Sequence, residues 1–136
     1  MRFLDTNVFL RYLTRDDDIK AQACLDLLRR VANGTEEVTT CEAVICEIVY
    51  MLSSRGVYKL RHDEVSALLR PLLSLRSLRL PRKRVYARAL DLYAVSPFLD
   101  FEDALSVAHM ERQGIEEIVS YDADFDRIPS VRRIEP

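Results

Sequence analysis

The sequence predicts an α/β fold: a three-layer α/β/α sandwich with a short, mostly parallel central sheet. Short apolar runs alternate with longer stretches of helical periodicity along the 136 residues. Strands separated by helices form parallel sheets whose two faces are covered by those helices. A hydrophobic content of 49% is enough for a core. No linker, repeat or shift in composition divides the chain, so we expect residues 1–136 to form a single domain.

The expected elements follow from apolar periodicity and from the residues that bound each run. Strands are expected at 2–4, 37–39, 77–80, 118–121 and 131–134. Helices are expected at 8–12, 19–31, 39–52, 62–75, 82–95 and 101–113. Thr39 and Glu42 have the spacing of a capping box at the start of the third helix. Asp100 is the expected N-cap of the last helix, and Gly114 is expected to end it.

Composition excludes several classes of protein. Three glycines and 31% charged residues argue against a disordered or fibrous chain. No apolar run approaches the roughly 20 residues that cross a bilayer, and Asp5 and Arg11 interrupt any signal peptide, so we expect no membrane association. Cys24, Cys41 and Cys46 make an odd count without a CxxC motif, which favours reduced thiols in a cytoplasmic protein.

Charge is unevenly distributed, although the net charge is only −2. Residues 65–90 contain no acidic residue and carry Arg70, Arg76, Arg79, Arg82, Lys83, Arg84 and Arg88. Acidic residues concentrate instead at 16–18, 100–103 and 122–126. This polarity suits a phosphate backbone lying on arginines beside an acidic pocket. The alternative is a solvated helix face whose basic residues aid solubility.

Two acidic residues follow predicted strands. Asp5 comes directly after the first apolar run, and Asp122 comes directly after the run at 118–121. Parallel strands place their carboxyl ends at one edge of the sheet, where ligands bind. Carboxylates gathered there repel one another unless a cation lies among them or some are protonated. The pattern therefore predicts a metal site, and a metal site suggests phosphodiester chemistry.

Each of these carboxylates also has a simpler interpretation. Asp5 could cap the helix that follows it, although Thr6 or Asn7 could do so equally well. Glu47 lies at the margin of an apolar helical stripe and has no capping role, but a surface charge is the commonest role of a helical glutamate.

The remaining acidic residues form two clusters. Asp100 and Asp103 are three apart at a helix start and share one face, so either could contact a metal. Asp122, Asp124 and Asp126 alternate as in a calcium-binding loop. Such a loop needs glycine and glutamate at its sixth and twelfth positions, where this chain has arginines. Calcium-loop binding is therefore rejected, and Asp122, nearest the strand end, remains the candidate.

Taken in order, four motifs resemble the PIN domain family. They are Asp5-Thr6-Asn7, Glu47, Phe101-Glu102-Asp103-Ala104-Leu105 and Ser120-Tyr121-Asp122-Ala123-Asp124-Phe125. The resemblance spans essentially the whole chain, and the nearest group is the small VapC-type toxins of toxin–antitoxin pairs. It implies a metal-dependent endoribonuclease with a Rossmann-like sandwich. Such a protein usually works as a homodimer and is silenced by an antitoxin peptide in its active-site groove.

The resemblance also implies roles for individual residues. The acidic quartet would be Asp5, Glu47, Asp103 and Asp122. Asp5 and Asp103 would hold Mg²⁺ or Mn²⁺, while Glu47 and Asp122 would position water or hold a second ion. Further candidates around the metal are Thr6, Asn7, Asp100 and Ser120, the last standing where many members have threonine. Arg82 and Arg84 are the candidates for RNA contact.

Two other functions remain open on sequence grounds. A phosphotransfer enzyme of the haloacid-dehalogenase type would use Asp5 as a covalent nucleophile. That class needs a second aspartate two residues later, where this chain has Asn7. A non-catalytic PIN-like module would use the acidic pocket only for docking. Cleavage of RNA, release of phosphate from small esters, or binding without cleavage would separate the three.

Overall fold

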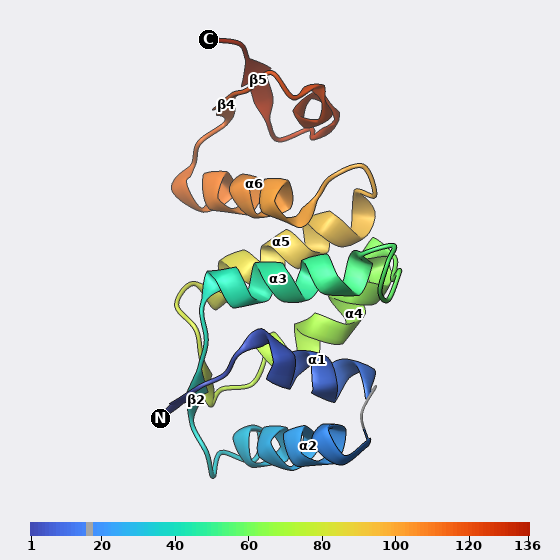
Figure 1. Ribbon diagram of the computed structural model, residues 1–136. Coiled ribbons are helices and arrows are strands. Elements are labelled where there is room, and N and C mark those ends of the chain that lie inside the picture. The colour runs from blue at the N-terminus through green and yellow to red at the C-terminus, as the bar shows by residue number, and fades with distance from the viewer. Residues whose placement is uncertain (16–17) are drawn as a thin grey trace.

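A computed structural model describes residues 1–15 and 18–136, and it shows a mixed α/β protein with short parallel strands (Figure 1). The predicted fold class is confirmed. The helices are α1 (Thr6–Thr14), α2 (Asp18–Ala32), α3 (Glu42–Ser53), α4 (His62–Leu73), α5 (Lys83–Val95) and α6 (Phe101–Gln113). The strands are β1 (Arg2–Phe3), β2 (Val38–Thr39), β3 (Leu78–Arg79), β4 (Glu117–Val119) and β5 (Arg132–Ile134), and η1 (Ala123–Arg127) is a short 3-10 helix. Asp16 and Asp17, from one acidic cluster of the sequence, lie outside the described residues.

The strands lie in two separate sheets, whereas the sequence predicted one. In the described residues β1, β2 and β3 form a parallel sheet in that order, and β4 and β5 form a second parallel pair. The chain passes from β3 through α5 and α6 before it reaches β4. Figure 1 shows β4 and β5 at the opposite end of the molecule from β1 and β2. Apolar periodicity locates strands but carries no information about which strands pair across such a distance.

The core is built around α3. Its apolar stripe, Val44, Ile45, Ile48, Val49 and Leu52, is buried, and the helix packs against α1, α4 and α6. The helix α5 packs in turn between α4 and α6, and α2 covers α1 (Figure 1). The result is a layered stack of helices that joins the two sheets.

Capping decides several helix ends, and one prediction about a cap was wrong. The N-cap of α3 is Cys41. Thr39 lies in β2 and donates its hydroxyl to the carbonyl of Arg79 at 2.7 Å, so the expected capping box does not form. The cap at Asp100 is confirmed, because its side chain accepts a hydrogen bond from Asp103 N–H. Gly114 ends α6 with a left-handed φ of 69°, as predicted.

Two expectations from composition can also be compared with the structure. Cys24, Cys41 and Cys46 are free thiols. Within the described ranges, no helix has both the length and the apolar character required to span a bilayer.

We predict that truncation of Leu52 strongly destabilises the protein. Its side chain is 0% exposed, and a Leu→Ala change in a packed core costs about 2–5 kcal/mol. Urea unfolding of Leu52→Ala should show this loss in the free energy of unfolding. The matched control is Tyr50→Ala on the same helix, whose side chain is 66% exposed. That change should stay within about 0.5 kcal/mol of the wild type. Equal losses for the two variants would contradict the central place of α3.

Candidate active site

Three of the predicted site residues meet where α1 faces α3; we call Asp5, Thr6 and Glu47 the α1–α3 half-site. Thr6 is buried, and its hydroxyl donates a hydrogen bond to Oε2 of Glu47 at 2.7 Å. Asp5 stands at the N-cap position of α1, yet its side chain makes no capping hydrogen bond. Its carboxylate is exposed and is therefore available to a ligand.

The backbone around this half-site is held by the end of the first sheet. The hydroxyl of Thr40 donates to the carbonyl of Leu4 at 2.9 Å, and Leu4 N–H donates to the carbonyl of Thr39 at 2.8 Å. These bonds tie the exit of β1 to the segment that enters α3. The apolar stripe of α3 is buried on its other side, so Glu47 is presented outward, toward Thr6.

The other predicted acidic residues meet at the start of α6; we call Asp100, Asp103 and Asp122 the α6–β4 half-site. Asp100 Oδ1 accepts a hydrogen bond from Asp103 N–H at 2.9 Å. Asp122 follows β4, and its Oδ1 accepts a hydrogen bond from Asp124 N–H at 2.9 Å. Ser120 supports this turn, because its hydroxyl accepts a hydrogen bond from Asp122 N–H at 3.0 Å. Helix N-termini with free N–H groups tolerate this concentration of negative charge.

Asp103 is the residue of the α6–β4 half-site whose pKa is raised. The pKa of the Asp103 carboxyl is raised from 3.8 to about 6, chiefly by burial and additionally by the negative charges of Asp100, Asp122 and Glu102. Carboxylates that repel one another in this way have a strong electrostatic preference for a cation. The oxygen donors are of the hard type that Mg²⁺ and Mn²⁺ prefer, so the chemistry of these side chains suits such an ion.

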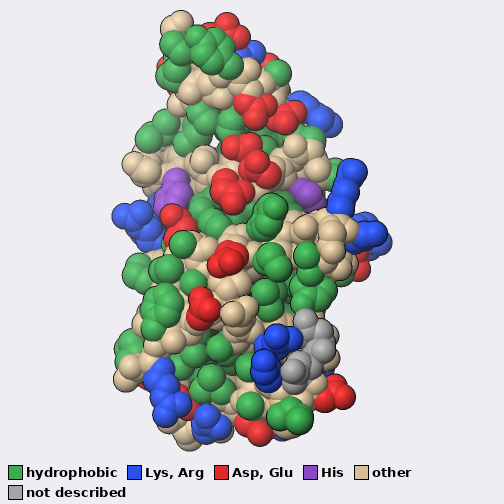
Figure 2. Space-filling model, in the orientation of Figure 1, with side chains coloured by type: hydrophobic (Ala, Val, Ile, Leu, Met, Phe, Trp, Pro, Cys, Tyr) green, Lys and Arg blue, Asp and Glu red, His purple; other side chains and the backbone are tan. Residues whose placement is uncertain are grey.

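The structure does not bring the four predicted acidic residues into one cluster. Asp5 and Glu47 are absent from the groups that raise the pKa of Asp103. In residues 1–15 and 18–136, no three His, Cys, Asp or Glu side chains converge closely enough to hold a metal. Figure 2 shows acidic side chains gathered over α6 and just above it, with others scattered over α3 and below it. Each half-site therefore presents part of the predicted ligand set.

The remaining predicted residues, Asn7, Arg82 and Arg84, lie outside the two half-sites. Asn7 lines a pocket between α1 and α2 together with Arg11, Lys20 and Cys24. Arg82 and Arg84 are exposed at the start of α5.

Ion pairs divide the basic segment into two groups. Arg70 pairs with Asp91, Arg79 with Glu37 and Arg88 with Glu111, at 2.6–3.0 Å. Arg82 and Arg84 form no ion pair with any residue that the structure describes. Their charges, like that of the exposed Arg76, are therefore available to a phosphate.

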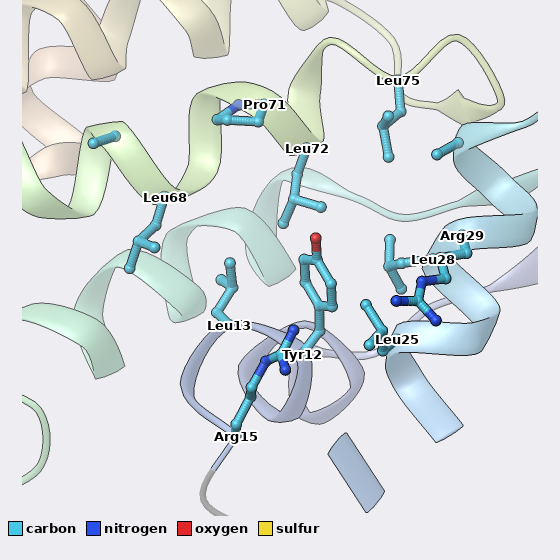
Figure 3. A pocket seen from close by; sticks show the side chains of 12 residues that line it. Tyr12, Leu13, Arg15, Leu25, Leu28, Arg29, Leu68, Pro71, Leu72 and Leu75 are labelled. Atoms are coloured by element: carbon cyan, nitrogen blue, oxygen red, sulfur yellow. The ribbon is translucent and has the colours of Figure 1, made fainter. Parts of the chain in front are cut away.

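A pocket lined mainly by apolar side chains lies away from both half-sites. It measures about 410 Å³ and is enclosed by α1, α2 and α4 (Figure 3). Leu13, Leu28, Leu68 and Leu72 are among the side chains that line it, and it contains no acidic residue. A pocket of this composition could hold apolar groups but cannot coordinate a divalent cation. The chemistry of the protein is therefore expected at the half-sites, outside this pocket.

One positioning residue was missed by the sequence analysis. His62 Nε2 lies 2.8 Å from the carbonyl oxygen of Leu99, and its ring stacks on Tyr93 at 3.7 Å between centroids. These contacts fix the loop immediately before Asp100 and so fix the start of α6. A histidine at the beginning of a helix carries no sequence signal for a contact 37 residues away.

Comparison with known proteins identifies the family. The profile of the PIN domain matches residues 2–131. The chain belongs to the PIN domain family. A VapC ribonuclease of Aquifex aeolicus (strain VF5) is 25% identical over 128 residues, which cover 94% of this chain and 92% of the relative. Among solved structures, Mycobacterium tuberculosis VapC20, described as a toxin that cleaves the Sarcin-Ricin loop, is 20% identical and covers 100% of both chains, with a TM-score of 0.38.

We predict that Asp103→Asn makes stability less dependent on pH. A raised folded-state pKa means that charging Asp103 disfavours the fold. The penalty is absent below the ordinary pKa of 3.8, grows as the pH rises and is complete above about 6. At pH 7.5 without metal, the variant should be more stable by on the order of 1 kcal/mol, after allowance for solvent screening. Urea unfolding near pH 3.5 should give the same free energy of unfolding for the variant and the wild type. An equal gain in stability at both pH values would show that the charge of Asp103 is not the cause.

Proposed function

We propose that the protein is a metal-dependent endoribonuclease that hydrolyses RNA phosphodiester bonds, and that it is the toxin of a VapBC-type toxin–antitoxin pair. The observation that carries the proposal is the pair of acidic half-sites. Within a PIN-domain chain, four carboxylates occupy the exits of β1 and β4 and the helices α3 and α6. The relative that is named a VapC ribonuclease supports the same function.

The proposed cofactor is Mg²⁺, with Mn²⁺ as a substitute. Asp5 and Asp103 would hold it. When bound, such an ion activates a water molecule and stabilises negative charge on a phosphate oxygen. Glu47, kept in place by the Thr6 hydroxyl, would orient the attacking water and accept its proton. Asp122 would share in holding the ion or orient the leaving group, and Asp100 keeps Asp103 at the first turn of α6.

The proposed substrate contact uses the arginines of α5. Arg82 and Arg84 are exposed, and we propose that they bind RNA phosphates. Protein side chains recognise bases mainly where RNA is unpaired, so a loop or single strand is the expected target. The proposed partners are a cognate antitoxin peptide and a second copy of the chain. Residues 1–136 would act as one catalytic domain.

The first functional test is cleavage of single-stranded RNA with and without Mg²⁺. We expect cleavage that EDTA abolishes and that each of Asp5→Asn, Glu47→Gln, Asp103→Asn and Asp122→Asn reduces by at least about 10²-fold, because each removes an oxygen needed in the transition state. Asp124→Asn, a matched change two residues from Asp122, should retain activity. Circular dichroism checks folding.

Other outcomes of that assay would contradict the proposal. Release of phosphate from small esters with a trapped phospho-aspartate would indicate phosphotransfer. Binding of RNA without cleavage would indicate a docking module.

A second test concerns Arg82 and Arg84. The double variant Arg82→Ala with Arg84→Ala should weaken RNA binding and reduce the slope of log K against log salt concentration by about 1.4, the value for two phosphate contacts on a single strand. Fluorescence anisotropy across a salt series measures the slope. Arg55→Ala, an exposed arginine after α3, is the control and should leave the slope unchanged. An unchanged slope in the double variant would make these arginines solubility residues.

A further inference from the structure

The loop that joins α5 to α6 is anchored to the start of α4. Residues 96–99 lead directly into Asp100, and Leu99 N–H donates to the carbonyl of Ser96 at 2.9 Å. Both Ser96 and Leu99 are buried. His62 Nε2 lies 2.8 Å from the carbonyl oxygen of Leu99. The loop is therefore fixed in place, and a residue that contacts it is held relative to α6.

A residue near the C-terminal end of the chain contacts this loop. Arg127 is the last residue of η1, and its Cζ lies 3.8 Å from the centroid of the Phe98 ring. A guanidinium over an aromatic ring is attracted by the negative face of the ring. Arg127 forms no ion pair with any residue that the structure describes, and its neighbour Asp126 pairs with Arg133 instead. The ring of Phe98 is therefore the contact that determines where this guanidinium lies.

Asp122 is bonded to the same short helix. It is the N-cap of η1: its Oδ1 accepts a hydrogen bond from Asp124 N–H at 2.9 Å, and its carbonyl accepts one from Phe125 N–H at 3.3 Å. Phe125 is buried, which keeps η1 against the rest of the protein. Hydrophobic burial is non-directional, so it does not by itself determine where the Asp122 carboxylate points. Arg127 supplies a directional contact at the other end of η1.

The carboxylates of Asp122 and Asp103 repel each other. The negative charge of Asp122 is one of the causes that raise the pKa of Asp103, so the two groups are close enough to interact. Arg127 is not among the groups that shift this pKa. Its charge therefore does not neutralise the pair, and it opposes the repulsion by holding η1 in place through Phe98.

We propose that Arg127 and Phe98 form a brace that holds Asp122 opposite Asp103, and that Arg127 is thereby a positioning residue for a divalent ion at the α6–β4 half-site. Phe98 lies two residues before Asp100, whose carboxylate accepts the N–H of Asp103 at 2.9 Å. The brace thus connects the two sides of this half-site through one loop. The effect on metal binding rests on the proposed function, whereas the brace itself does not.

The brace should increase the affinity of the site for a divalent ion. Ligands that are already in position bind a metal more tightly, because binding does not first have to bring like charges together. The gain cannot exceed the strength of the contact that holds them. For a guanidinium over a ring at an exposed site, this corresponds to about a two- to fivefold change in affinity.

The brace is tested by amide hydrogen exchange without metal. Arg127→Gln and Phe98→Leu should each speed exchange of the Asp124 and Phe125 amides, which bond to Asp122, by about two- to fivefold. Phe98→Tyr keeps the aromatic face and should exchange like the wild type. The control is Arg112→Gln, an exposed arginine at the end of α6, which should change nothing. Unchanged exchange in both Arg127→Gln and Phe98→Leu overturns the brace.

The positioning role is tested by calorimetric titration with Mn²⁺. Arg127→Gln and Phe98→Leu should each weaken Mn²⁺ binding about two- to fivefold. The double variant should lose no more than either single variant, because both changes break the same contact. Phe98→Tyr and Arg112→Gln should bind as tightly as the wild type. Arg127 is exposed, so its replacement should leave the fold intact, which circular dichroism checks. Unchanged affinity in folded variants, or additive losses in the double variant, overturns the positioning role.

The outcomes separate this proposal from the proposed function. In RNA cleavage, Arg127→Gln should raise the half-saturating Mg²⁺ concentration two- to fivefold and lower the rate at saturating Mg²⁺ by a smaller factor. If the wild type cleaves no RNA, the nuclease function fails, and the Mn²⁺ titrations still decide the role of Arg127. If the wild type binds no Mn²⁺, the metal dependence and the positioning role are both wrong. The exchange rates then still decide whether the brace exists.

Discussion

Burial of α3 is the constraint on which the rest of the structure depends. Its apolar residues pack against α1, α4 and α6, so this one helix fixes the positions of the elements that carry acidic side chains. Glu47 leaves the buried stripe toward α1, where Thr6 holds it at 2.7 Å. From its other side α3 supports α6, whose first turn carries Asp103. A change in the packing of α3 would therefore move both half-sites at once.

Like-charge repulsion accounts for the separation between the two groups of acidic residues. The α6–β4 half-site already concentrates enough charge to raise the pKa of Asp103 to about 6. Bringing Asp5 and Glu47 beside it without a cation would add further repulsion. A divalent ion reverses the sign of that interaction, because the same oxygens then become ligands. Assembly of the full acidic set and binding of metal are thus expected to be coupled.

The division of the strands into two sheets has a related consequence. Strands of two or three residues are too short to be stable alone and gain most from additional neighbours. Ion pairs involve strands of both sheets: Arg2 of β1 pairs with Glu36, and Glu117 of β4 pairs with Arg132 of β5.

Local chemistry in the sequence determined the elements and several of their ends. Helical periodicity located the six helices, the carboxylate of Asp100 capped α6, and Gly114 ended it, because each of these effects acts within a few residues. The motif order also determined the family. Tertiary structure alone decided the division of the strands into two sheets and the hydrogen bond from Thr39 to the carbonyl of Arg79. It also decided the hydrogen bond from Thr6 to Glu47, which joins residues 41 positions apart. It also decided the raised pKa of Asp103, since burial and neighbouring charges exist only once distant segments have packed together.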